Sequence, residues 1–175
     1  MKRAVTNYLD FEVDKLTRSI ENVVTGDRFI TEVTHLLKTD LKQLTKRGGW
    51  LFNWQAELIS SEREVYKLTI QGNPMVIQGL ISISVEPDHI YMHLIESAPF
   101  NKGKGKVYLG VPGNLVAYAC RLSFQKGLDG FVAFHSKTKL IEHYTETLGA
   151  YHFGGHLMII DTLPAKALID KYFKE

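Results

Sequence analysis

The sequence predicts an α/β protein whose helices cover both faces of a mixed sheet. Within residues 64–97, three apolar or alternating segments are separated by short turns, which predicts antiparallel neighbouring strands. Through residues 114–161, helix and strand patterns then alternate, as is typical of parallel strands joined by crossover helices. A glycine-containing loop at 103–113 joins the two halves. We therefore expect an antiparallel meander followed by a β-α-β-α-β unit.

Composition limits the class of protein. A chain of 175 residues is long enough for one domain with a substantial core, and 45% hydrophobic with 23% charged residues is ordinary for a globular protein. A net charge of +2 does not favour a general affinity for nucleic acids or membranes. Cys120 is the only cysteine, which excludes a disulfide framework and a thiolate-rich zinc site. With no apolar run of about 18 residues and no signal-peptide core, we expect a cytoplasmic protein without membrane attachment.

The elements follow from local patterns. Residues 11–24 and 27–36 have strand character and are joined by the turn signal Thr25-Gly26-Asp27, and helical patterns follow at 39–46 and 50–63. The three strands of the meander are expected at 64–70, 75–85 and 89–97. The second half is expected to contain a helix at 114–126, a strand at 130–136, a helix at 137–149, a strand at 156–161 and a helix from Thr162.

The loop before the helix at 114–126 has the composition of an anion site. Gly110 and Gly113 flank Pro112, and a helix N-terminus next to them offers unpaired N–H groups and a partial positive charge. Glycines let a ligand approach the backbone, so the loop could hold a phosphate, with Lys102, Lys104 and Lys106 adding charge. The alternative is a solvated basic loop with glycines at a helix start.

Two side chains could carry proton transfer. Glu96 ends an apolar stripe of Ile90, Met92 and Leu94 on one expected strand face, so its carboxylate is paired, exposed at the strand end, or a general base. Tyr144 shares a helix face with apolar residues, which is typical of a core aromatic, although a phenol can also protonate a departing thiolate.

The remaining reactive residue types give weaker patterns. His89 and His93 have the spacing of a His-Glu-x-x-His motif, but Ile90 stands where the glutamate is needed and no third ligand follows, so we predict no metal site. Cys120 lies among apolar residues of the expected helix, which predicts a buried, inert thiol.

Two stretches together resemble a known family. Residues 110–134, "GVPGNLVAYACRLSFQKGLDGFVAF", look like motif A of the GNAT superfamily of acyl-CoA-dependent N-acetyltransferases. Residues 137–153, "KTKLIEHYTETLGAYHF", look like its motif B. The resemblance implies one GNAT-like domain over 1–175. It would have an acyl-CoA-binding core at 63–161, an acceptor side within 1–62 and a terminal helix at 162–175.

The resemblance also implies a role for each candidate residue. Acetyl-CoA would be the cosubstrate, Tyr144 would protonate its departing thiolate, and Glu96 would deprotonate the attacking amine. The backbone around Leu94, Ile95 and Ser97 would pair with the pantetheine arm. The remaining cofactor-binding positions, at the helix start and at the start of motif B, would be Gly110, Val111, Gly113, Asn114, Leu115 and Lys137.

Three functions follow from these residues. The first is an N-acetyltransferase that acts on a small-molecule or peptide primary amine, with Trp50 and Trp54 either walling the acceptor pocket or lying in the core. The second is a catalytically silent GNAT-fold module that binds acyl-CoA or a partner; it is favoured by Val107 and Pro112, which depart from the motif A loop. The third is a nucleic-acid-binding domain, against which the near-neutral charge argues. A homodimer is compatible with the first two.

Overall fold

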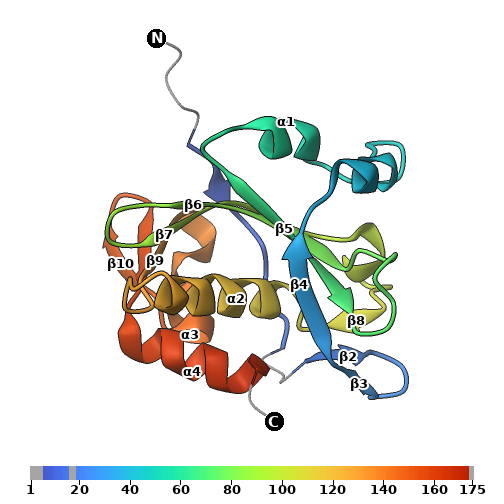
Figure 1. Cartoon of the computed structure of the whole chain (residues 1–175). Coiled ribbons are helices and arrows are strands. Elements are labelled where there is room, and N and C mark those ends of the chain that lie inside the picture. The colour runs from blue at the N-terminus through green and yellow to red at the C-terminus, as the bar shows by residue number, and fades with distance from the viewer. Residues whose placement is uncertain (1–5, 16–18, 174–175) are drawn as a thin grey trace.

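The computed structural model describes residues 6–15 and 19–173, which build a large mixed sheet, a small sheet and four α-helices (Figure 1). The large sheet has the order β10-β11-β9-β7-β6-β5-β4, with β1 also paired to β9. Its strands are β1 (Tyr8–Leu9), β4 (Thr31–His35), β5 (Glu64–Ile70), β6 (Gly79–Val85), β7 (Ile90–Ser97), β9 (Val132–Ser136), β10 (Tyr151–Gly154) and β11 (Leu157–Ile160).

The small sheet has the order β3-β2-β8 and is built from β2 (Ile20–Asn22), β3 (Arg28–Phe29) and β8 (Tyr108–Leu109). The α-helices are α1 (Trp54–Ile59), α2 (Val111–Gln125), α3 (Ile141–Leu148) and α4 (Thr162–Phe173). Short 3₁₀ turns span Lys38–Gln43, Pro99–Asn101 and Thr138–Leu140. None of the helices in the described ranges is long and apolar enough to cross a bilayer.

The predicted meander and the first crossover are confirmed. Strands β5, β6 and β7 are antiparallel neighbours, β4 extends them, and β7 is parallel to β9 through the crossover helix α2. The predicted parallel pairing of the last two strands is wrong, because β11 runs antiparallel to β9. The cause is the unexpected strand β10, which follows α3 and turns back into β11 at Gly154 and Gly155, both with positive φ.

The first third of the chain is less regular than its composition suggested. Of the expected strand at 11–24, only β2 forms, and residues 16–18 lie outside the described ranges. The helix expected at 39–46 is a 3₁₀ turn. The helix expected at 50–63 shortens to α1, because the side chain of Asn53 accepts a hydrogen bond from the Ala56 N–H and starts the helix there.

Two cores lie on opposite faces of the large sheet. The larger contains the apolar face of α2 and residues of α3 and α4, and the smaller contains Trp50, Trp54, Leu80 and Leu94. Figure 1 shows α1 on one side of the sheet and α2 with α4 on the other. Trp50 is 5% exposed and Trp54 1% exposed, so both tryptophans belong to the core rather than to a pocket wall.

A β-bulge in β7 changes which side chains share a face. Ser82 of β6 is opposite Leu94 and Ile83 is opposite Met92, so His93 is an extra residue in β7. As a result Met92 lies in the larger core and Leu94 in the smaller one. The expectation that Ile90, Met92, Leu94 and Glu96 point to one side is therefore wrong beyond Met92, because a bulge inverts the alternation of a strand.

Candidate functional site

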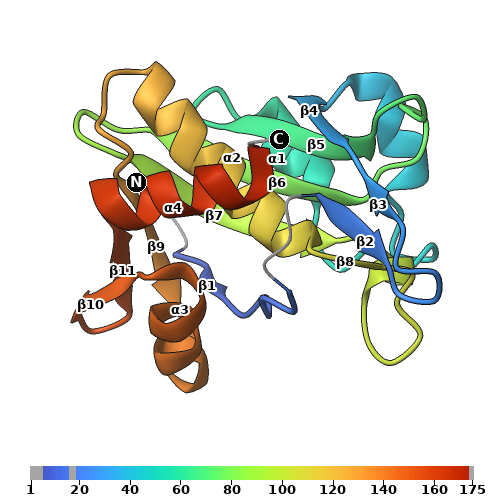
Figure 2. The same cartoon turned by 90° about the horizontal axis from the view of Figure 1, so that it is seen from below.

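The parallel strands β7 and β9 separate soon after they pair. Their ladder joins only Ile90 with Val132 and Tyr91 with Ala133. Beyond it, the N-terminal segment of residues 6–15, called the strap below, pairs with β9 through β1, with Tyr8 opposite His135. Figure 2 shows the strap leaving β9 towards the small sheet. The strap therefore lies in the gap that opens between the two central strands.

The strap is anchored by its apolar side chains. Leu9 and Val13 are 4% and 7% exposed, and the ring of Phe11 packs 4.7 Å from the ring of Tyr144, measured between centroids. Burying such side chains stabilises a protein by about 1.5–3 kcal/mol each. The Val13 N–H also donates to His143 Nε2 at 2.9 Å. The strap is thus a fixed wall of the gap rather than a loosely held cover.

A cavity of about 640 Å³ remains between the strap and β7. It is lined by strap residues, by Leu94–Ser97 of β7, by Leu51 and Phe52, and by the lysines Lys102, Lys106 and Lys137. Of the strands in the described part of the chain, none pairs with Leu94–Ser97 on the side away from β6. The cavity therefore gives a ligand access to this stretch of backbone, where the family resemblance implies a pantetheine arm.

Glu96 lies in the wall of the cavity and is fully hydrogen-bonded. Its oxygens accept from the N–H of Leu51 at 2.8 Å, the N–H of Phe52 at 3.3 Å, the indole N–H of Trp54 at 2.8 Å and Lys102 Nζ at 2.7 Å. A carboxylate can accept about four hydrogen bonds, so these four donors occupy all of its acceptor sites. The geometry matches the paired alternative, in which Glu96 ties the chain before α1 to β7.

One of these donors is able to leave. The side chain of Lys102 is 34% exposed, whereas that of Glu96 is 2% exposed. Because Lys102 is long and reaches solvent, it can swing away and free one lone pair of Glu96 beside the cavity. The other three donors are held by the backbone and by a buried indole ring.

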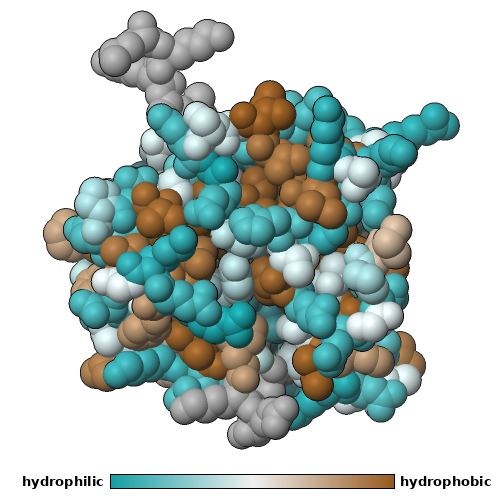
Figure 3. All heavy atoms as spheres, in the orientation of Figure 1, coloured by the Kyte–Doolittle hydropathy of each residue, from teal (hydrophilic) through white to brown (hydrophobic). Residues whose placement is uncertain are grey.

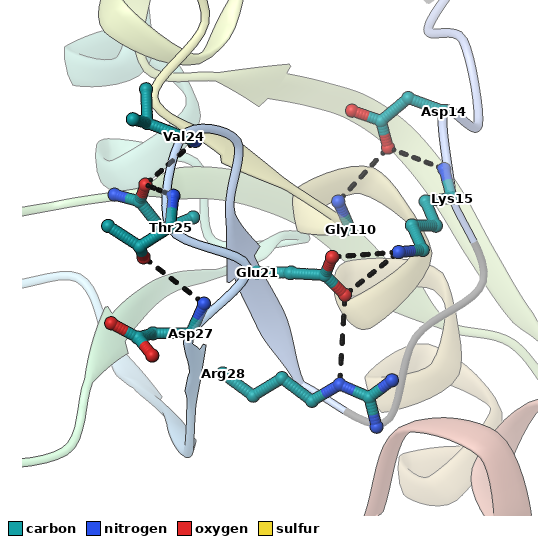
Figure 4. A network of polar contacts seen from close by, with 9 residues as sticks. Asp14, Lys15, Glu21, Val24, Thr25, Asp27, Arg28 and Gly110 are labelled. Atoms are coloured by element: carbon teal, nitrogen blue, oxygen red, sulfur yellow. Dashed lines mark hydrogen bonds and ion pairs between the residues drawn. The ribbon is translucent and has the colours of Figure 1, made fainter.

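The start of α2 is closed by the protein itself. The helix begins at Val111, three residues earlier than predicted, after Gly110 in the left-handed region at φ 93°. The Gly110 N–H donates to Asp14 Oδ1 at 3.0 Å, and Lys106 Nζ lies 3.1 Å from Asp14 Oδ2. Figure 4 shows the Asp14 carboxylate facing the Gly110 nitrogen. An anion therefore does occupy this helix N-terminus, and it comes from the strap.

The residues after Gly110 face protein. Val111, Gly113, Asn114 and Leu115 are buried, and of positions 111–115 only Pro112 lines the cavity. The Asn114 amide donates to the Gly110 carbonyl at 2.8 Å and accepts from Thr31 Oγ1 at 3.0 Å. The expected phosphate-binding positions thus lie beside the cavity but are covered, whereas Leu94, Ile95, Ser97 and Lys137 line it.

Tyr144 lies behind the strap. It is completely buried, and its hydroxyl donates to the Phe11 carbonyl at 2.6 Å. Burial raises the pKa of this phenol above its usual value of 10. The side chain fits the alternative of a core aromatic with a satisfied hydroxyl, and it can protonate a thiolate only if it exchanges its hydrogen bond with Phe11 for one to the ligand.

The acidic residues of the strap were missed as parts of the site. Asp10 pairs with Lys137 at 2.7 Å and Asp14 with Lys106, so both acids neutralise lysines that line the cavity. The signal was present as an alternation of apolar Leu9, Phe11 and Val13 with acids. Sequence alone could not show that the strap lies beside β9, or that its acidic residues face the cavity.

The other reactive residues lie elsewhere. Cys120 is fully buried as predicted, and burial raises the pKa of its thiol. His93 Nε2 is hydrogen-bonded to Ser84 Oγ at 2.7 Å. Within residues 6–15 and 19–173, no three His, Cys, Asp or Glu side chains are grouped as a metal site would require.

Comparisons with known proteins define the fold class. No protein family and no curated protein matches the sequence. A solved spermidine N-acetyltransferase, a SpeG chimera from Vibrio cholerae and hSSAT, is similar over 78% of this chain and 98% of its own, with a TM-score of 0.52 and 14% identity. The chain therefore has the fold of the GNAT superfamily.

Two further structures are similar at lower scores. The KacTA–DNA complex matches over 86% of this chain and 96% of its own, with a TM-score of 0.48 and 13% identity. The ribosomal-protein-S18-alanine N-acetyltransferase from Escherichia coli matches over 76% of this chain and 94% of its own, with a TM-score of 0.44 and 14% identity.

Proposed function

We propose that this protein is an acyltransferase that holds the thioester arm of acetyl-CoA in the cavity between the strap and β7 and transfers the acetyl group to a primary amine. The observation that carries the proposal is the backbone of Leu94–Ser97, which pairs with β6 on one side and, on its other side, with none of the described strands; it faces a cavity of about 640 Å³ in a GNAT fold. A pantetheine arm contains amide groups and can pair with such an edge as an added strand does.

The reaction needs no covalent intermediate on the protein. The amine nitrogen attacks the thioester carbonyl carbon and forms a C–N bond. The C–S bond breaks, and CoA departs as a thiolate that takes up a proton from water. The attacking amine must lose a proton, and we assign this step to Glu96 after Lys102 has moved away. Holding both reactants in one cavity supplies a large part of the acceleration.

The acceptor would approach past Leu51 and Phe52, which line the cavity ahead of α1. Leu51 is 68% exposed and Ile59 of α1 is 76% exposed, and Figure 3 shows apolar side chains gathered over this helix. This apolar surface suits the carbon chain of a small-molecule or peptide amine, while the amino group enters the cavity.

The alternative is a catalytically silent GNAT-fold module. It is favoured by one observation: the polar groups of Glu96 and Tyr144 are both hydrogen-bonded to other groups of the protein. Such a module would bind a thioester or a partner without turnover.

Calorimetric titration of the full chain with acetyl-CoA, followed by an amine screen for thiol release, tests the proposal. We expect micromolar binding, and a Ser97→Trp variant should lose at least about tenfold in affinity because Ser97 lines the cavity. Tyr151→Trp, on the exposed strand β10, is the matched control and should bind normally. Absence of binding at millimolar acetyl-CoA would overturn the proposal; binding without thiol release would support the silent module.

A further inference from the structure

The carboxylate of Asp14 is the resident anion at the start of α2. Its side chain is 13% exposed, one oxygen accepts from the Gly110 N–H, and the other lies 3.1 Å from Lys106 Nζ. A negative charge at a helix N-terminus is stabilised by the helix dipole. Gly110, one of the expected cofactor-binding positions, therefore donates its N–H to a carboxylate of the chain itself.

The other positive groups around the cavity are paired in the same way. Lys137 lies 2.7 Å from Asp10 and Lys102 lies 2.7 Å from Glu96, so each lysine that lines the cavity faces a carboxylate of its own wall. A diphosphate entering here would have to displace these carboxylates and would meet the added negative charge of Glu12, which also lines the cavity.

Asp14 cannot be removed simply by lifting the strap. The residues on either side of it along the strap are held by Leu9, Phe11 and Val13 in the larger core, and the carbonyl of Lys15 accepts from the Tyr172 hydroxyl at 3.0 Å. A donor must therefore bind while the strap is in place. With the strap in place, a donor can reach the backbone of Leu94–Ser97 in the cavity, but it cannot reach the start of α2.

We infer that, in the reaction proposed above, the acyl donor is recognised by its pantetheine arm, and that Asp14 excludes the diphosphate of CoA from the start of α2. The inference rests on the proposed function and names the donor class more narrowly. The preferred chemistry is a pantetheine thioester, and the nucleotide end of CoA adds little affinity.

Titration of the full chain with two thioesters tests the inference. S-acetylpantetheine lacks the diphosphate and adenosine of acetyl-CoA, and we expect its dissociation constant to lie within about threefold of that of acetyl-CoA. In Asp14→Asn the amide can still accept from Gly110 while the charge is gone, so acetyl-CoA should bind about fivefold tighter and S-acetylpantetheine unchanged.

A control variant shows whether the effect of Asp14→Asn comes from its place at the start of α2 or from the change in net charge. Glu146→Gln removes the same charge from an exposed position of α3 that does not line the cavity, and it should change acetyl-CoA affinity by less than about twofold. If S-acetylpantetheine binds more than about thirtyfold weaker than acetyl-CoA, the inference is overturned and the proposed function stands. If neither thioester binds, both fall.

Discussion

The hydroxyl of Tyr172, in α4, packs directly against the Cα of Gly113, in the first turn of α2. A β-carbon placed on Gly113 would lie 1.8 Å from the Tyr172 hydroxyl oxygen and 2.4 Å from the ring carbon that carries it. Gly113 is therefore required for the close packing of two helices, whereas the sequence suggested close approach of a phosphate. The same hydroxyl holds the strap at Lys15, so α2, α4 and the strap meet at one point.

Gly113→Ala should consequently destabilise the protein without any ligand. We expect a loss of about 1–3 kcal/mol in the free energy of unfolding, measured by urea denaturation, because buried atoms must move to admit one methyl group. Gly105→Ala is the matched control, since a β-carbon there meets nothing within 4 Å. Equal stability of the two variants would contradict the packing role.

Glu96→Gln should affect both stability and turnover. A glutamine cannot accept all four hydrogen bonds, so we expect a loss of about 1–3 kcal/mol in a denaturation experiment. If Glu96 is the base, acyl transfer should also fall by about 10²-fold or more. Lys102→Met removes only the partly exposed donor and should cost less than about 1 kcal/mol. Wild-type turnover in a folded Glu96→Gln protein would remove Glu96 from the reaction.

Tyr144→Phe tests whether the hydroxyl anchors the strap or protonates the thiolate. Because the hydroxyl donates to the Phe11 carbonyl, its loss should leave a buried acceptor unpaired and lower the free energy of unfolding by about 1–3 kcal/mol. We expect kcat to change by less than about threefold, since the hydroxyl is not part of the cavity lining. A hundredfold fall in kcat at unchanged donor affinity would instead establish Tyr144 as the acid.

His93 should make stability depend on pH. Burial, with the nearby Arg63 guanidinium, lowers the pKa of His93 to about 4, while the unfolded chain titrates near 6.5. Between these values the unfolded state binds more protons, so the free energy of unfolding falls as pH decreases from 6.5 to 4, by up to about 3 kcal/mol. The melting temperatures of wild type and His93→Gln should therefore approach each other as pH decreases from 6.5 to 4. His152→Gln, at an exposed position, should keep the wild-type slope.

Part of the site could be predicted from local patterns. The alternation in β7 identified the strand that carries Glu96, and the composition of residues 110–134 identified the crossover that follows. The orientation of Glu96 could not be predicted, because the extra residue His93 in the bulge shifts every later side chain to the other face. A bulge leaves no periodic signal in one strand, since it is defined by the partner strand.

The sequence by itself determined the α/β class of fold, with a meander followed by a crossover, because hydrophobic periodicity, turns and helix starts are local properties that specify the order of elements. The GNAT fold was implied by the resemblance of residues 110–134 and 137–153 to two motifs of that superfamily. The sequence also determined that Cys120 is a core residue. Only the tertiary structure decided that the strap fills the gap beside β9, that Asp14 takes the helix start, and that Gly113 accommodates Tyr172. Asp14 and Gly110 are separated by 96 positions in the sequence, and Gly113 and Tyr172 are separated by 59. Such pairs are selected by the packing of the whole core, which no window of sequence contains.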